Sequence, residues 1–180
     1  MFNQGMFYKN TLNKPEYRFD LEADIKGYDA KQGCATDIPL PDAFINCMIL
    51  DPPFMHSTHG QTKNNPNTKR YTMFDSYKDL ENLYREILRE SYRVLRNNGV
   101  LIFKCQDYTD SKTTMTHCLV YNLATIRGFY AKDIAILERP NKIYNGNFRQ
   151  QHLRKSHSYF WVFVKKSSRK SWIDELLEDE

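Results

Sequence analysis

The sequence has 180 residues, of which 41% are hydrophobic and 14% aromatic, and its formal net charge at pH 7 is +4. This length and apolar content are enough for one domain with a buried core. No run of about 18 apolar residues occurs, so the sequence predicts no membrane span. The N-terminus shows no charged-then-apolar secretory pattern, and the mild positive charge permits a nucleic-acid partner without requiring one.

The four cysteines, Cys34, Cys47, Cys105 and Cys118, are scattered and form no C-x-x-C pair. This spacing is typical of reduced thiols in a cytoplasmic protein rather than of a zinc site or a disulfide framework. The sequence therefore predicts no metal.

The first half of the chain contains three candidate strands. Residues 17–21 alternate between polar and apolar and end near Asp20, and residues 33–38 form a short candidate strand that contains Asp37. Residues 47–50 are an apolar run that ends at an acid and two prolines, as expected for a buried strand that stops there. Residues 56–71 have no apolar period and predict a long loop, which in a compact domain is usually functional or disordered.

The second half alternates helices and strands. An apolar stripe at helical spacing predicts a helix over residues 75–95, closed by the Asn-Asn-Gly at 97–99, and a second helix covers residues 117–126. Strands are predicted at 100–103, 133–137 and 158–164, with a polar loop at 141–156 before the last strand.

This alternation predicts a single-domain α/β fold with a mostly parallel sheet. No helix separates the last two strands, so they are expected to form an antiparallel pair at one edge. The predicted organisation is an N-terminal segment over residues 1–16, one domain over 17–166, and a charged C-terminal tail over 167–180.

The strand end at residues 51–54 carries the strongest chemical signal, the sequence Asp51, Pro52, Pro53 and Phe54. In an open α/β sheet, ligands bind at the carboxyl ends of the strands. A carboxylate and a turn carbonyl can accept the two hydrogens of an amino group, while the aromatic ring stacks on a flat base. Such contacts favour a nucleophilic amine and catalyse mainly by positioning it. The alternative is an ordinary strand end followed by a Pro-Pro turn.

Two loops are rich in cationic and titratable side chains. His56, His59, Lys63, Lys69 and Arg70 follow the tetrapeptide, and Arg149, His152, Arg154, Lys155 and His157 precede the last strand. Both groups are candidate nucleic-acid contacts, and for the first a solvated loop is an equal alternative. Lys104 and Gln106, at another strand end, could line the same pocket or simply cap the strand.

From Asp20 to Val164 the chain resembles S-adenosylmethionine-dependent amino-methyltransferases, chiefly adenine-N6 DNA methylases. The pieces that carry the resemblance are residues 40–42 leading into 48–54, and residues 93–102. Two further pieces, at 104–107 and 151–160, resemble a branch associated with phages and mobile elements. The resemblance implies a Rossmann-like methyltransferase fold, a DNA or RNA substrate and S-adenosylmethionine as cofactor.

The resemblance also implies roles for individual residues. Asp51, Pro52, Pro53 and Phe54 would hold and stack the target base. Asp37, with Ile38 beside it, matches the acid that contacts the cofactor adenine, Asp20 matches the acid that binds the ribose, and Asp51 would border the cofactor. For Asp20 and Asp37, carboxylates that cap loops are the alternative.

One departure from the family concerns the glycine-rich cofactor loop. The chain has only 7 glycines, and no two of them form the Phe-x-Gly-x-Gly pattern. Residues 3–7 could form an abbreviated substitute, cofactor binding could be lost, or a partner chain could complete the site. The leading function is methyl transfer to adenine N6 in DNA. The alternatives are an RNA or tRNA amino-methyltransferase and a non-catalytic nucleic-acid-binding subunit.

Overall fold

The computed structural model describes residues 15–21, 30–56, 73–110, 112–138, 152–153 and 155–166. The C-terminal tail from residue 167 and most of the two long loops lie outside these residues. The predicted domain boundaries therefore stay predictions.

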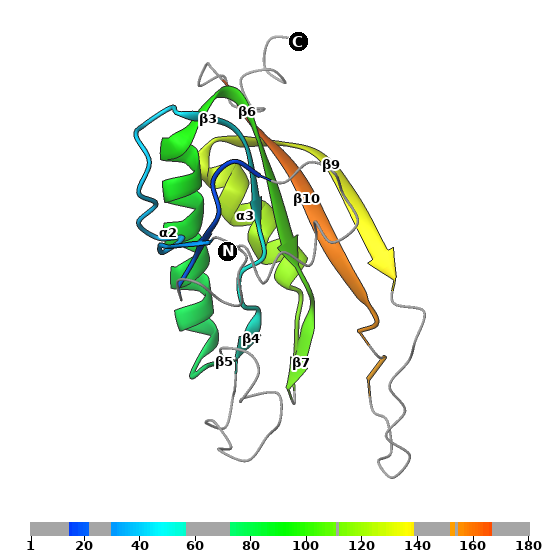
Figure 1. The fold of residues 1–180 in the computed structure, drawn as a ribbon. Helices are drawn as coiled ribbons and strands as arrows, with labels where there is room; N and C mark the ends of the chain where they lie inside the picture. Colours follow the sequence, from blue (N-terminus) through cyan, green and yellow to red (C-terminus); the bar gives the residue numbers. More distant parts are fainter. Residues whose placement is uncertain are drawn as a thin grey trace, which may run out of the picture.

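A four-stranded sheet forms the centre of the molecule. Its strands are β3 (Ile45–Leu50), β6 (Leu95–Cys105), β10 (His157–Lys165) and β9 (Phe129–Glu138), side by side in that order (Figure 1). β3 is parallel to β6, whereas β10 is antiparallel to both β6 and β9. The predicted α/β class and antiparallel edge pair are confirmed. The sheet is mixed rather than mostly parallel, because β10 inserts between β6 and β9 and runs against both.

Within the described residues, three two-stranded pairs accompany the sheet. They are β1 (Phe19–Asp20) with β2 (Lys31–Gln32), β4 (Met55–His56) with β5 (Met73–Phe74), and β7 (Tyr108–Asp110) with β8 (Lys112–Thr114). The predicted strand over 33–38 is not formed. The Asp37 amide instead donates to the Cys34 carbonyl at 3.1 Å, so this segment closes on itself as a turn.

The helix α2 (Tyr77–Val94) forms where the apolar stripe predicts it. The Ser76 side chain accepts a hydrogen bond from the Asp79 amide at 3.2 Å and so caps the N-terminus. At the other end, the Lys165 ammonium donates to the carbonyls of Tyr92 and Leu95 at 2.7 and 2.8 Å. These bonds supply partners for carbonyls that a helix end leaves unpaired.

The predicted end of this helix at 97–99 is wrong. Leu95 is already extended, and residues 97–99 form an irregularity within β6, where Asn98 has a φ of 62°. The second helix, α3 (Thr116–Arg127), does end at a glycine, because Gly128 adopts a left-handed φ of 108°. Neither of these two described helices is long and apolar enough to cross a membrane.

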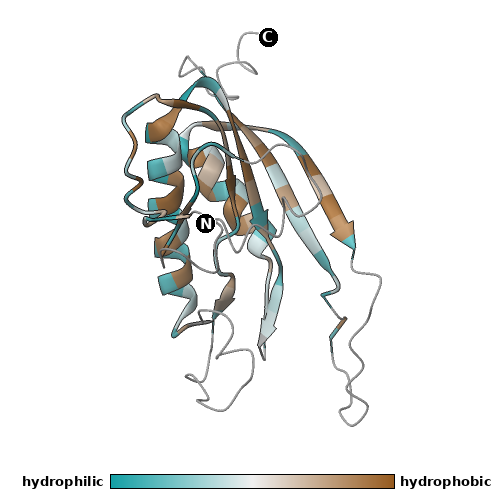
Figure 2. Cartoon of the chain, viewed as in Figure 1, coloured by the Kyte–Doolittle hydropathy of each residue, from teal (hydrophilic) through white to brown (hydrophobic). Residues whose placement is uncertain are grey.

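Both helices pack against the same face of the sheet. The β6 side chains Leu101, Phe103 and Cys105 are at most 1% exposed and belong to one buried cluster with Tyr84 of α2 and Val120 of α3. Figure 2 shows the sheet strands dominated by hydrophobic residues, while α2 alternates between hydrophobic and hydrophilic bands. The core thus fixes α2 beside the carboxyl end of β3, where the candidate site begins.

Candidate active site

The predicted tetrapeptide follows β3 directly. Leu50 is buried, Pro52 is buried, and Asp51, Pro53 and Phe54 are partly exposed. The two prolines stop the strand because they have no N–H for the ladder. The chain then enters the short strand β4, in which Met55 is 7% exposed. The tetrapeptide is therefore held between two buried anchors, Leu50 and Met55.

Tyr84 of α2 fixes the proline turn. Its hydroxyl donates to the Pro53 carbonyl at 3.1 Å, and its ring contacts Phe103 edge to face. Burial raises the pKa of this hydroxyl well above its ordinary value, so it stays protonated and remains a donor. The sequence placed Tyr84 only in the apolar stripe of the helix and gave no sign of this contact.

We predict that Tyr84→Phe will loosen the turn without disturbing the core. The ring stays, but the Pro53 carbonyl loses its donor, which should lower the free energy of unfolding by about 1 kcal/mol. Chemical denaturation measures this change. Tyr121→Phe, which removes a hydroxyl from an exposed tyrosine on α3, is the control. An unchanged stability in Tyr84→Phe would contradict the anchoring role.

Asp51 forms an ion pair with Lys104 of β6. The Lys104 ammonium lies 2.9 Å from each carboxylate oxygen, and the side chains of Asp51 and Lys104 are only 8% and 18% exposed. Strand register explains the pairing, because Leu50 lies opposite Phe103 and the next residues of the two strands are therefore neighbours. The structure therefore places Lys104 beside Asp51, and the two alternatives for Lys104 stay predictions.

His56 does not fit the predicted phosphate contact. Its residue is 3% exposed, its ring lies edge to face against Tyr77 and Tyr108, and its Nε2 is 2.8 Å from the Thr114 hydroxyl. The side chain is therefore buried among Tyr77, Tyr108 and Thr114. Lys69 and Arg70 lie outside the described residues.

The three other predicted cofactor residues lie on two separate segments. Asp20 ends β1, and its carboxylate accepts a hydrogen bond from the Leu21 amide at 2.8 Å. Asp37 is exposed in its turn, and Ile38 is 7% exposed. Asp37 is therefore exposed to solvent, whereas the next residue, Ile38, is buried and anchors the turn.

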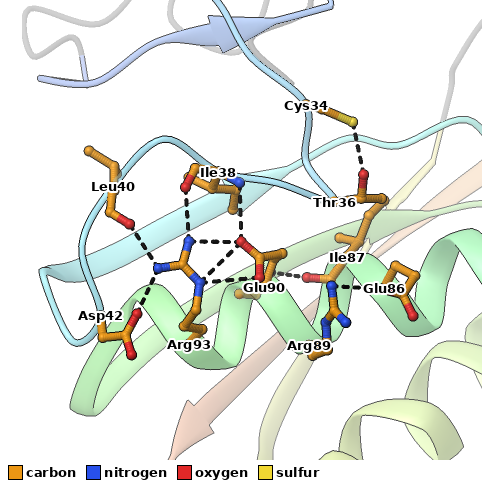
Figure 3. A network of polar contacts seen from close by, with 11 residues as sticks. Cys34, Thr36, Ile38, Leu40, Asp42, Glu86, Ile87, Arg89, Glu90 and Arg93 are labelled. Atoms are coloured by element: carbon orange, nitrogen blue, oxygen red, sulfur yellow. Dashed lines mark hydrogen bonds and ion pairs between the residues drawn. The ribbon is translucent and has the colours of Figure 1, made fainter.

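Ile38 is held by an ion pair on α2 (Figure 3). The Glu90 carboxylate accepts from the Ile38 amide at 3.1 Å, and the Arg93 guanidinium donates to the carbonyls of Ile38 and Leu40, each at 2.9 Å. Arg93 also pairs with Glu90 at 2.8 Å and with Asp42 at 2.7 Å. The hydrogen bond from Arg93 lowers the pKa of Glu90. The hydrogen bonds that Arg93 donates to Glu90 and Asp42 raise the pKa of Arg93.

One helix thus positions both candidate segments. Tyr84 holds the proline turn, and Glu90 lies six residues further along α2. At 1.5 Å per residue, these anchors are about 9 Å apart along the helix axis.

We predict an acid-sensitive contribution of Glu90 to stability. Its folded-state pKa lies below the ordinary value of 4.5, so the stabilisation is complete above that value and is lost as the pH falls through the folded pKa. Glu90→Gln should lower the free energy of unfolding by about 1–3 kcal/mol at neutral pH, and by less in acid. Denaturation at both pH values tests this. If Glu90→Gln lowers the free energy of unfolding equally at neutral and acid pH, the prediction is contradicted. Glu86→Gln is the matched control.

The predicted basic strip before β10 is only partly described. Arg149 and Arg154 lie outside the described residues, His152 is exposed, and the Lys155 carbonyl accepts from the Gln106 side chain at 3.1 Å. His157 begins β10, and its Nε2 lies 2.8 Å from the Tyr159 hydroxyl. The structure therefore places Lys155 and His157 beside the end of β6, and the roles of the other strip residues stay predictions.

A polar network that the sequence did not predict lies at the same strand end. The buried Asp107 carboxylate is 2.7 Å from Nδ1 of His117 and accepts from the Tyr159 hydroxyl at 3.4 Å. Burial and the nearby Asp107 charge raise the pKa of Tyr159. Trp161 donates to the His117 carbonyl at 3.0 Å, so these contacts join α3 to β6 and β10. In the sequence, Asp107 stood out only through the resemblance to a phage branch.

Residues 45–180 match the family model described as DNA methylase, of the N6/N4 type. The match covers more than half of the chain, from the first residue of β3 onward. The chain belongs to the DNA methylase family. No curated protein sequence matches it.

A solved methyltransferase structure shares the fold of this family member. The cytosine-N4-specific PvuII DNA methyltransferase aligns with a TM-score of 0.52 at 13% identity, over 74% of this chain and 48% of that one. A protein from Thermus thermophilus named as a DNA modification methylase aligns with a TM-score of 0.48 at 14% identity, over 72% and 48%. The chain thus spans about half the length of these structures.

The described residues of this family member fit one part of S-adenosylmethionine. Asp37 presents an exposed carboxylate, which suits the hydroxyl and amino groups of adenosine, and Ile38 supplies a rigid neighbour. The described glycines serve local packing instead of a cofactor cradle. A Cβ at Gly33 would lie 3.0 Å from the Phe19 ring, and one at Gly99 would lie 2.7 Å from the Arg96 carbonyl. The described residues therefore contain no glycine-rich loop for the methionine part.

Across the parts of the chain that the structure describes, no group of three or more His, Cys, Asp or Glu side chains could hold a metal ion.

Proposed function

We propose that this chain acts in the transfer of a methyl group from S-adenosylmethionine to an exocyclic amino group of a base in DNA. The observation that carries the proposal is the placement of the tetrapeptide 51–54 at the carboxyl end of β3, in a chain of the DNA methylase family. Ligands of open α/β sheets bind at this edge.

Asp51 and the proline turn would hold the amine. The Asp51 carboxylate accepts one amino hydrogen, since a carboxylate only accepts hydrogen bonds and has about four acceptor positions. Tyr84 holds the Pro53 carbonyl, which makes the carbonyl of Pro52 our candidate acceptor for the second amino hydrogen. Phe54 stacks on the base.

Asp37 and Ile38 would hold the adenosine part of the cofactor, and Asp20 would bind its ribose. When bound, S-adenosylmethionine supplies an electrophilic methyl group on sulfur. We infer that polypeptide outside the described residues, or a partner chain, contacts its methionine part. Support comes from the described glycines, all of which serve local structure, and from the share of the matched structures that the chain spans.

Adenine N6 is our leading target, because the sequence pieces around residues 48–54 and 93–102 resemble adenine-N6 methylases. Cytosine N4 is the second candidate, since one matched structure is cytosine-N4-specific. His152, Lys155 and His157, together with Lys69, Arg70, Arg149 and Arg154, are proposed contacts of the DNA backbone.

Transfer of a labelled methyl group to unmethylated DNA, with bulk RNA in parallel, tests the function. Chromatography of the hydrolysed product separates methylated adenine from methylated cytosine. Calorimetry with S-adenosylmethionine reports cofactor binding separately. A chain that neither binds cofactor nor transfers methyl, even with its natural partners present, would be a non-catalytic member of the family.

A further inference from the structure

The Asp51–Lys104 ion pair is more than a local stabiliser. Both side chains are largely buried, at 8% and 18% exposure. Removing two charges from water costs free energy that their mutual attraction often does not repay, and apolar residues of similar size are frequently as stable. Stability alone is therefore a weak reason for an ion pair beside the proline turn.

The pair places a hydrogen-bond acceptor next to a donor. Asp51 ends β3 and Lys104 lies beside it on β6, so both groups are fixed by the register of two strands rather than by a loop. A carboxylate only accepts hydrogen bonds, and an ammonium with three N–H groups only donates them. The sheet edge thus presents a fixed acceptor–donor pattern.

The target amines have the complementary pattern. In adenine the N6 amino group, a donor, is adjacent to the ring nitrogen N1, an acceptor. In cytosine the N4 amino group is likewise adjacent to the acceptor N3. On the Watson–Crick edge of guanine, the N–H donor at N1 lies next to the amino group and would face the ammonium donor to donor; the acceptor N3 lies on the other side of that amino group. Enzymes that act on a base taken out of the stack read this Watson–Crick edge.

We propose that Lys104 is a specificity-determining residue that donates to the ring nitrogen beside the amine that Asp51 accepts. The pair then admits adenine and cytosine by the same contact and rejects guanine that presents its Watson–Crick edge. This inference rests on the proposed function, because it assumes that Asp51 receives the target amine.

Equilibrium binding tests the contact without methyl transfer. The probes are a fluorescent single-stranded oligodeoxyadenosine and the same oligomer made with 1-deazaadenine, in which C–H replaces N1. One hydrogen bond predicts that the wild type binds the first about tenfold more tightly. Lys104→Met should bind both equally, whereas Lys104→Gln, which keeps N–H donors, should retain part of the preference.

The ratio of the two affinities separates base reading from a structural role. Loss of stability in Lys104→Met weakens binding of both oligomers and leaves the ratio unchanged. Lys132→Met, a lysine on β9, is the control and should keep the wild-type ratio. One outcome is a wild type that transfers no methyl group and still shows an affinity ratio that Lys104→Met abolishes. In that case the proposed function is wrong, and the contact of Lys104 with the ring nitrogen is supported. Equal ratios in wild type and Lys104→Met overturn the Lys104 assignment, whatever the transfer assay shows.

Discussion

Asp51→Ala is expected to abolish methyl transfer while leaving S-adenosylmethionine binding nearly intact. The carboxylate is assigned to the target amine, and an acceptor that acts mainly in the transition state affects the rate more than cofactor affinity. Removal of one preorganised hydrogen-bonding group of this kind lowers kcat by about 10²–10³-fold in other enzymes. Labelled methyl transfer to unmethylated DNA measures the rate, and calorimetry measures the cofactor affinity.

The ion pair complicates this substitution and suggests its control. Asp51→Ala leaves the largely buried Lys104 ammonium without its carboxylate, and breaking a buried pair from one side costs about 3–5 kcal/mol of stability. Asp51→Ala combined with Lys104→Met removes both charges and should recover part of that loss without recovering transfer. Asp133→Ala, an exposed acid on β9, should behave as the wild type.

Asp51→Asn distinguishes charge from hydrogen bonding. The side-chain carbonyl of asparagine still accepts one amino hydrogen, so this variant should retain measurable transfer where Asp51→Ala has none. Transfer at the wild-type level by a folded Asp51→Ala variant would remove Asp51 from the mechanism.

The elements that frame the site were predictable because their signals are local. The apolar run that ends at Asp51 needs only the adjacent prolines to define a strand end. α2 follows from its apolar stripe at helical spacing. Gly128 likewise ends α3 through its own backbone conformation. Each of these predictions depended on a few consecutive residues.

The contacts within the site were not predictable, because they join distant residues. Lys104 meets Asp51 only through the register of β3 with β6, across 53 residues, and Tyr84 reaches Pro53 across 31. The sequence predicted His56 as a loop residue that contacts nucleic acid. In the structure it lies in β4, which pairs with β5, and its side chain is buried. Asp37 looked like a strand end because the sequence does not show that its segment closes as a turn.

The division of residues into apolar and polar also misjudges Tyr84 and Lys104. A tyrosine in an apolar stripe is assigned to the core, which is correct for its ring and omits its hydroxyl. The same division would assign Lys104 to solvent, although its strand-end position made it a candidate for lining the pocket, and only 18% of its side chain is exposed. In both residues an apolar stem is buried while the polar end makes a specific contact.

Phe54→Ala is expected to weaken capture of the target base rather than the chemical step. Stacking of a base on an aromatic ring contributes about 1–3 kcal/mol, so the KM for DNA should rise by roughly 5–150-fold. Phe54 is partly exposed after the proline turn, so the substitution leaves no large core cavity. Steady-state kinetics with unmethylated DNA, at saturating S-adenosylmethionine, measures KM and kcat separately.

Two conservative variants decide whether the ring face is the cause. Phe54→Tyr keeps the face and should have a KM close to the wild type. Phe54→Leu keeps apolar bulk but has no aromatic face, so it should resemble Phe54→Ala. If leucine restores the wild-type KM, Phe54 acts as an apolar wall beside Asp51, and stacking is excluded as its role. If all three variants instead lower kcat at an unchanged KM, the residue positions the turn that carries the amine acceptors.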